Sequence, residues 1–176
     1  DRRAFHRGFQ RLQALGHAVE VDPDALARFQ RFAGDDATRR AAIERAAASG
    51  ADLALISRGG YGLTRLLPDM PWDAIRRATR AGTRFVGFSD FTVLQLALLR
   101  THPDAITWAG PALCEGFGQA QDKDPAAPAQ PDEIMLACFA DLLDGSAEGT
   151  GWRLTAADRR ALAQHPEILA RQATLW

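Results

Sequence analysis

The chain has 176 residues, 47% of them hydrophobic, and a formal net charge of −1. This length and apolar content suffice for one core of ordinary domain size, and the near-neutral charge gives no basic surface for nucleic acid or an anionic membrane. No apolar run is long enough to span a bilayer and no signal-peptide pattern opens the sequence, so we expect a cytoplasmic protein without nucleic-acid or membrane partners.

The N-terminal part alternates between helical and strand-like patterns. Apolar side chains at helical spacing predict a helix over residues 2–15 that ends at Gly16. The alternating valines Val19 and Val21 predict a short strand, and a further apolar face predicts a helix over residues 24–32.

Another helix and a buried strand follow. Asp35 or Asp36 is a suitable N-cap for a helix that continues to about Ala48 and ends at Gly50. Residues 52–57 form a continuous apolar run between turn signals, which is typical of a buried parallel strand.

The middle of the chain repeats this order. Short helices are predicted at residues 63–67 and 71–78, then a strand at 83–88, a helix at 90–100 and a strand at 105–111. Helices that alternate with strands indicate an α/β fold with a mostly parallel sheet flanked by helices.

After about Gln119 the sequence becomes polar and rich in proline, which is typical of a loop or linker. Beyond this stretch we predict a helix over residues 132–143, a short strand around 151–154 and helical structure at 156–163.

The two ends of the sequence suggest a fragment. A doubly wound sheet usually begins with a strand, yet this sequence begins inside a helix and ends at Trp176 in an apolar stretch. We therefore predict an α/β domain over residues 1–118 whose first strand is missing. Residues 119–176 are predicted to be a linker and the start of a truncated C-terminal domain.

Two turns follow predicted strands, and ligands collect at the carboxyl ends of the strands in parallel α/β sheets. In the Gly-Phe-Ser-Asp turn at residues 87–90, Ser89 fits a sharp strand-to-helix turn that exposes a nucleophilic hydroxyl. The generic Gly-x-Ser-x-Gly pattern is only half met, because Phe91 replaces the last glycine. The alternative is that Ser89 or Asp90 simply caps the helix that follows.

The other turn, Arg-Gly-Gly-Tyr-Gly at residues 58–62, contains the adjacent glycines Gly59 and Gly60. Such glycines let backbone N–H groups approach a phosphate, a carboxylate or an oxyanion, although a tight turn without a ligand is the competing interpretation. The turn matches neither the dinucleotide-binding nor the phosphate-loop pattern. Arg58 could equally form a salt bridge at the sheet edge, and Tyr61 could pack on the sheet.

The sequence offers no obvious catalytic base or metal site. The four histidines fall in contexts typical of surface or turn residues: His6, His17, His102 and His165. Cys114 and Cys138 have neither metal-ligand nor disulfide-framework spacing, so we expect small core residues, and no metal or organic cofactor.

Four stretches of the sequence belong together. They are FAGDDATRRAAIERA (32–46), ISRGGYGLTRLLP (56–68), FVGFSDFTVLQLAL (85–98) and TWAGPA (107–112). In this order and spacing the chain resembles the LD-carboxypeptidase family of serine peptidases, which includes muramoyl-tetrapeptide carboxypeptidases and microcin-immunity peptidases. The resemblance covers about residues 2–112 and implies a flavodoxin-like N-terminal domain joined to a C-terminal domain.

The resemblance also implies roles for individual residues. Ser89 matches the family's nucleophile, and the backbone N–H groups of Asp90 and of Gly59 or Gly60 match its oxyanion hole. The candidate substrate-binding residues are Arg58, Tyr61, Gly110 and Pro111.

The family's catalytic glutamate and histidine lie in the C-terminal domain, so we expect both beyond Trp176. Neither role is assigned to Glu115, to Glu133 or to any histidine of this chain. One departure from the family pattern is that Ala109 and Ala112 stand where many relatives carry the histidine and methionine of a His-Gly-Pro-Met run.

By resemblance, the full protein is a serine carboxypeptidase, without a cofactor and homodimeric, that removes the terminal D-amino acid of a murein tetrapeptide during peptidoglycan recycling. Residues 1–176 alone are expected to be inactive. One alternative is a microcin-immunity-type serine peptidase acting on a peptide- or aminoacyl-nucleotide. Another is a non-catalytic α/β module that binds phosphate or nucleotide through residues 58–62.

Overall fold

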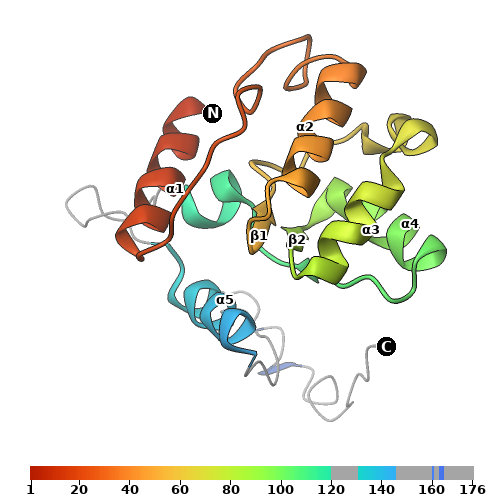
Figure 1. Ribbon diagram of the computed structural model, residues 1–176. Helices are drawn as coiled ribbons and strands as arrows, with labels where there is room; N and C mark the ends of the chain where they lie inside the picture. Colours follow the sequence, from red (N-terminus) through yellow and green to blue (C-terminus); the bar gives the residue numbers. More distant parts are fainter. Residues whose placement is uncertain (120–130, 146–159, 161–162, 165–176) are drawn as a thin grey trace. The chain divides into compact units, whose positions relative to one another are not determined.

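The computed structural model describes residues 1–119, 131–145, 160 and 163–164. The chain divides into two compact units, Asp1–Asp132 and Glu133–Trp176. The sheet and both candidate turns belong to the first unit (Figure 1). The domain boundary between residues 118 and 119 stays a prediction.

The sheet consists of three parallel strands in the order β1 (Leu53–Leu55), β2 (Arg84–Gly87) and β3 (Thr107–Ala109). Each strand pairs with the next one along the chain, so the carboxyl ends of all three meet at one edge of the sheet. The three strands predicted between residues 52 and 111 are confirmed with shorter bounds, and the α/β fold is confirmed with them.

Helices and short helical turns connect the strands. The helices of the described part are α1 (Arg2–Ala14), α2 (Asp36–Ala48), α3 (Trp72–Ala81), α4 (Thr92–Thr101) and α5 (Glu133–Asp144). Three 3₁₀ turns and one π-helical turn accompany them: Leu63–Arg65, Leu67–Asp69, Ser89–Phe91 and Leu113–Phe117. The predicted cap of α2 is confirmed, because the Asp35 carboxylate accepts a hydrogen bond from the Thr38 N–H at 2.8 Å.

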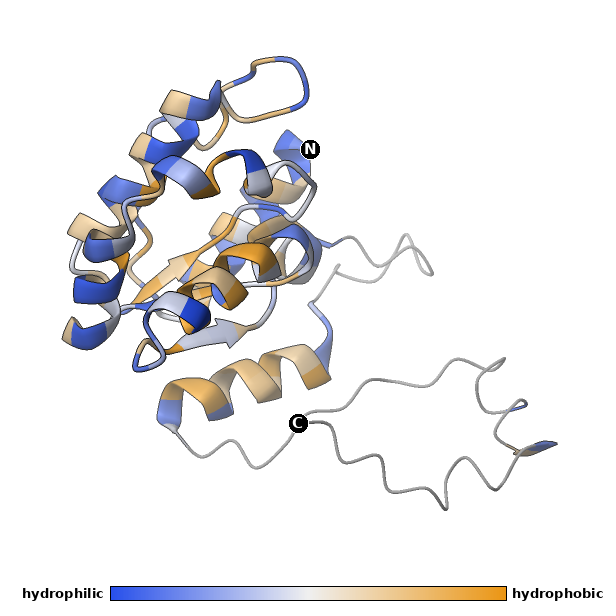
Figure 2. Ribbon diagram, turned by 90° about the vertical axis from the view of Figure 1, so that its right-hand side faces the viewer, coloured by the Kyte–Doolittle hydropathy of each residue, from blue (hydrophilic) through white to orange (hydrophobic). Residues whose placement is uncertain are grey.

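One hydrophobic core joins three helices to one face of the sheet. Its buried members come from β2, the short turns, α3 and α4: Leu66, Met70, Ile75, Ala78, Phe85, Phe91, Leu94 and Leu98. Ile43, Ala46 and Ala47 of α2 pack against this core, so α2, α3 and α4 share it. Figure 2 shows orange, apolar strand residues beside helices whose polar residues are blue, and one strand is pale because its residues are of intermediate hydropathy.

The remaining helix of the first unit, α1, anchors the segment that follows β3. In Figure 1, β1 and β2 lie between α1 and the pair α3 and α4, and α1 packs against the turn Leu113–Phe117. Gly8 permits this close packing, because a Cβ at Gly8 would lie 2.7 Å from the Leu113 carbonyl oxygen. Arg7 Nε donates a hydrogen bond to the Gly118 carbonyl at 3.0 Å.

The strand predicted at Val19 and Val21 is wrong. Residues 17–22 have no regular secondary structure, and all three strands of the described part lie between residues 53 and 109. A strand is stabilised by hydrogen bonds to a neighbouring strand, and none of the described strands pairs with this segment.

The helix predicted over residues 24–32 is also wrong. Turns replace it, followed by an isolated antiparallel bridge in which Phe29 and Phe32 exchange two backbone hydrogen bonds. Gln30, between them, has φ 53°, a left-handed conformation that a right-handed helix cannot contain.

The predictions for the C-terminal part are tested only in part. The helix predicted over residues 132–143 is confirmed as α5. The strand predicted around 151–154 and most of the helix predicted at 156–163 lie outside the described residues. In the part that the structure covers, no helix is both long and apolar enough to cross a membrane.

Candidate active site

Ser89 lies in a sharp turn between β2 and α4. The residue is exposed, and its φ of 62° falls in the left-handed region that serine rarely adopts. A conformation of this kind costs about 1–3 kcal/mol and persists only where the surrounding structure enforces it. Nucleophilic serines of α/β hydrolases occupy such strained strand-to-helix turns.

The packing around β2 shows how this turn is enforced. Gly87, the last residue of β2, is enclosed, since a Cβ there would lie 2.7 Å from both Ile56 Cδ1 and Phe91 Cδ1. The buried Gln95 of α4 donates from Nε2 to the Gly87 carbonyl at 3.4 Å and to a carbonyl of β3 at 2.8 Å. The chain on both sides of Ser89 is therefore fixed to the sheet.

Helix capping, the competing interpretation of this turn, is not observed. The 3₁₀ turn Ser89–Phe91 begins without a side-chain cap, and so does α4. The Asp90 carboxylate bonds elsewhere, because its Oδ2 accepts a hydrogen bond from the Leu63 N–H at 2.9 Å. The side chain of Asp90 thus ties the serine turn to the residues that follow the glycine-rich loop.

The glycine-rich loop, residues 58–62, lies directly beside Ser89, because β1 and β2 are neighbouring strands. A Cβ built on Gly59 would lie 3.1 Å from Ser89 Cβ and 3.4 Å from Ser89 Oγ. Gly60 has open space at its Cβ position but a φ of 129°, so the backbone conformation is what requires glycine there. The two turns singled out in the sequence therefore form one site.

Glu115, in the π-helical turn, is a member of this site that the sequence did not indicate. Its Oε2 accepts a hydrogen bond from the Gly59 N–H and its Oε1 one from Arg58 Nε, both at 3.2 Å. The salt bridge considered for Arg58 is thus present. These partners lie 56 and 57 positions away in sequence, and only the preceding Gly-Pro turn marks this region as special.

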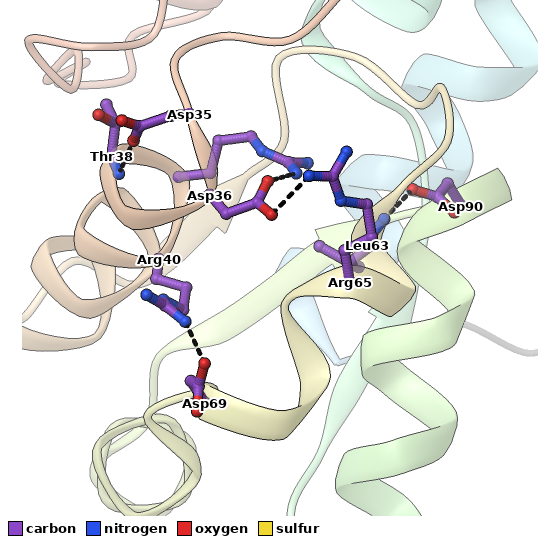
Figure 3. A network of polar contacts seen from close by, with 9 residues as sticks. Asp35, Asp36, Thr38, Arg40, Leu63, Arg65, Asp69 and Asp90 are labelled. Atoms are coloured by element: carbon purple, nitrogen blue, oxygen red, sulfur yellow. Dashed lines mark hydrogen bonds and ion pairs between the residues drawn. The ribbon is translucent and has the colours of Figure 1, made fainter.

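Two carboxylates hold the far end of the glycine-rich loop (Figure 3). Asp90 binds the backbone at Leu63, as described above, and Asp36 of α2 accepts hydrogen bonds from Arg39 at 2.6 Å and Arg65 at 2.9 Å. The hydrogen bond from Arg39 lowers the pKa of the Asp36 carboxyl, which keeps it ionised and paired. The first turn of α2 is thereby linked to the segment after the loop.

Tyr61 packs on an aromatic ring rather than on the sheet. Its ring centroid lies 5.3 Å from that of Phe32, and the Arg39 guanidinium lies 4.2 Å from the Phe32 centroid on the same platform. Gly62 fits against this ring only without a side chain, since a Cβ there would lie 2.9 Å from Phe32 Cε1. Tyr61 remains 58% exposed, so its phenol is accessible from solvent.

Gly110 and Pro111 lie at the same edge of the sheet, directly after β3. The Gly110 N–H donates to the Gly87 carbonyl at 3.1 Å, and a Cβ at Gly110 would lie 2.7 Å from Val86 Cγ1. This close packing turns the chain toward the π-helical turn that carries Glu115.

The described histidines belong to elements other than the serine turn. His102 ends α4, about 15 Å from the start of that helix at 1.5 Å per residue. His6 lies in α1, where it lines a shallow apolar hollow with residues of the segment 21–26, and His17 follows that helix. His165 is outside the described residues. A cluster of His, Cys, Asp or Glu able to hold a metal ion is absent from the described residues.

Cys114 is the thiol nearest in sequence to the site, since it precedes Glu115. Burial raises the pKa of this thiol, and the Glu115 carboxylate adds to the rise. The protonated thiol is a weak nucleophile, which agrees with the structural role predicted for it.

The family described as the LD-carboxypeptidase N-terminal domain matches residues 1–110. This match covers more than half of the chain and contains both turns of the candidate site, so the chain belongs to this family.

Individual relatives agree with this assignment. A protein of Streptomyces coelicolor, provisionally named a carboxypeptidase, is 41% identical over 96 residues, which are 52% of this chain and 30% of that protein. The crystal structure of muramoyltetrapeptide carboxypeptidase from Oxalobacter formigenes is 29% identical with a TM-score of 0.65, over 80% of this chain and 43% of that one. The microcin C7 self-immunity protein MccF, bound to aspartyl sulfamoyl adenosine, has a TM-score of 0.67 over 88% of this chain and 43% of its own. At 23% identity, it supports the fold alone. The chain thus spans less than half the length of these relatives.

Proposed function

We propose that the protein carrying this chain is a serine LD-carboxypeptidase. It hydrolyses the amide between an L-configured residue and the C-terminal D-amino acid of a murein tetrapeptide. The observation that carries the proposal is the exposed, left-handed Ser89 packed against Gly59. Membership of the LD-carboxypeptidase family and the likeness to a muramoyltetrapeptide carboxypeptidase support this substrate class.

In the proposed reaction, Ser89 Oγ attacks the carbonyl carbon of the terminal amide while its proton passes to a histidine. The C–N bond then breaks, the nitrogen takes the proton, and the D-amino acid leaves. The remaining peptide is held as an ester on Ser89. Water, deprotonated by the same histidine, hydrolyses this ester and restores the serine hydroxyl.

Backbone N–H groups stabilise the oxyanion of each tetrahedral intermediate in this proposal. One belongs to Asp90, and the other to Gly60 rather than Gly59, because the Gly59 N–H already donates to the Glu115 carboxylate at 3.2 Å. The proposed substrate contacts around them are Arg58, Tyr61, Gly110 and Pro111. The exposure of Arg58 and Tyr61 supports their part in this set.

The histidine and the glutamate that orients it are proposed to lie beyond Trp176. Two observations support this: the chain covers 43% of the carboxypeptidase structure that it resembles, and the described histidines belong to α1, the segment after it and the end of α4 rather than to the serine turn. We also propose, from the family resemblance, a cytoplasmic homodimer that acts in peptidoglycan recycling without a cofactor.

The test is release of D-alanine from murein tetrapeptide by the full-length protein and by its Ser89→Ala variant. The variant is expected to unfold at the temperature of the wild type and to lose turnover, and residues 1–176 alone are expected to show none. Turnover by Ser89→Ala would overturn the assignment of the nucleophile. Hydrolysis of an aminoacyl-nucleotide in preference to tetrapeptide would favour the microcin-immunity alternative, and nucleotide binding without hydrolysis would favour a binding module.

A further inference from the structure

We infer that Glu115 is a positioning residue of the serine site: its carboxylate fixes the path of residues 58–59 past Ser89. This inference rests on the proposed function, because it concerns the geometry around the proposed nucleophile. Glu115 itself touches no reacting atom in the proposed reaction. It acts through the backbone of the glycine-rich loop.

Backbone hydrogen bonds join the π-helical turn to the segment that leads into the glycine-rich loop. The Leu113 N–H donates to the Ile56 carbonyl and the Cys114 N–H to the Ser57 carbonyl, each at 2.9 Å. These backbone bonds stop at Ser57, and beyond it the Glu115 side chain makes the hydrogen bonds to the loop. Its two oxygens accept hydrogen bonds from Arg58 and Gly59, the next two residues of the loop segment.

The turn that carries Glu115 is itself held in place by α1. Arg7 of α1 donates to the Gly118 carbonyl at 3.0 Å, and Arg11 of α1 donates to the Phe117 carbonyl. Ala112, Leu113 and Phe117 are buried, so the turn is also held by packing. The Glu115 carboxylate therefore reaches the loop from a turn that is bound to α1, a helix of 13 residues.

The glycine-rich loop leaves little space beside Ser89. A Cβ at Gly59 would lie 3.1 Å from Ser89 Cβ, so the loop backbone runs in direct contact with the nucleophile turn. A shift of the Gly59 peptide unit would also move the N–H of Gly60, the proposed oxyanion donor. Misplacement of a catalytic group by about 1 Å can reduce the rate about 100-fold.

The global stability of the protein depends little on this interaction. The Arg58 side chain is 68% exposed and that of Glu115 34%, and ion pairs with this exposure contribute little to folding. Replacing Glu115 should therefore lower kcat while leaving the unfolding temperature nearly unchanged. Replacing a residue needed only for folding would instead lower the unfolding temperature and leave the kcat of the folded protein unchanged.

The experiment measures kcat and KM for D-alanine release by the full-length protein, together with the unfolding temperature. Glu115→Ala is expected to lower kcat about 10- to 100-fold, because the Gly59 N–H loses its acceptor. The unfolding temperature is expected to fall by less than about 4 °C. Glu115→Gln is expected to stay within about threefold of the wild type, because its amide oxygen can still accept the Gly59 hydrogen bond. Glu44→Ala, at an exposed glutamate of α2, is the matched control and should behave as the wild type.

Wild-type kcat in Glu115→Ala, or equal losses in Glu115→Ala and Glu115→Gln, would overturn the inference. So would a loss of activity that follows a large fall in unfolding temperature. The Ser89→Ala variant in the same assay separates the two proposals. If it retains turnover, Ser89 is not the nucleophile and the proposed serine mechanism is wrong. If it is inactive while Glu115→Ala is unaffected, only the positioning role is wrong.

Discussion

Ser89 combines an exposed hydroxyl with a backbone conformation that any side chain disfavours. In the left-handed region the Cβ approaches the following carbonyl oxygen, which costs about 1–2 kcal/mol relative to the right-handed region. The fixed ends of the turn, at Gly87 and at Phe91, hold the residue in that conformation. The strain is the consequence of presenting the hydroxyl beside Gly59 rather than toward the helix.

Replacing Ser89 with glycine should relieve this strain. We expect Ser89→Gly to be about 0.5–1 kcal/mol more stable than Ser89→Ala in denaturant unfolding, once the greater flexibility of unfolded glycine is counted. Gln30, with φ 53°, provides a control outside the site. Gln30→Gly should likewise be more stable to denaturant than Gln30→Ala, and it should leave turnover unchanged. Greater stability of Ser89→Ala would contradict the left-handed conformation.

At this scale the sequence indicates the small residues that lie side by side in the candidate site, but not the partners of those residues. Ser89, Gly59 and Gly60 belong to short motifs, and the physical need for a sharp turn and for close backbone approach is local. Glu115 was missed because its contacts cross 56 and 57 positions of the chain. The φ of Ser89 is likewise set by packing at β2 and α4.

The elements around the site depend on the end of β2, where three parts of the fold converge. Gly87 is enclosed by Ile56 after β1 and by Phe91 before α4, and its carbonyl accepts a hydrogen bond from Gly110 after β3. The absence of a side chain at Gly87 lets all three segments approach each other. The order of β1, β2 and β3 thereby brings the loops after them to one site.

A methyl group at Gly87 should therefore be destabilising. Gly87→Ala places a Cβ 2.7 Å from Ile56 Cδ1 and from Phe91 Cδ1, and overpacking of this kind costs about 1–3 kcal/mol. Adding Ile56→Val removes the Cδ1 contact but keeps the Cγ1 atom at 2.9 Å, so it should recover part of the loss, measured by thermal or denaturant unfolding. An unchanged unfolding midpoint in Gly87→Ala would contradict the packing described here.

The predicted elements succeed where local pattern and packing agree. Apolar runs predict all three strands, and the strands pair with one another in one parallel sheet. The helix predicted over residues 24–32 is wrong, since Phe29 and Phe32 pair in an isolated antiparallel bridge and not on one helix face. Phe32 supports Tyr61 and Arg39 from other parts of the chain, and no helical pattern can reveal that contact.

At the scale of the whole molecule, the chain is shorter than the relatives that it resembles. The family match covers residues 1–110, and the chain spans 43% of the carboxypeptidase structure that it resembles. The nucleophile turn, the glycine-rich loop and Glu115 all lie within the unit Asp1–Asp132. We propose that this unit presents the serine and the oxyanion donors, and that the rest of the full-length protein supplies the base.

The most direct measurement is the covalent state of Ser89 during turnover. The full-length protein is mixed with murein tetrapeptide, quenched with acid at successive times, digested and analysed by mass spectrometry, with D-alanine measured in parallel. We predict that the peptide containing Ser89 gains the mass of the shortened peptide less one water, as an ester, and that Ser89→Ala gains none. An acyl group on another side chain, or a burst of D-alanine with Ser89 unmodified, would contradict the nucleophilic role of this serine.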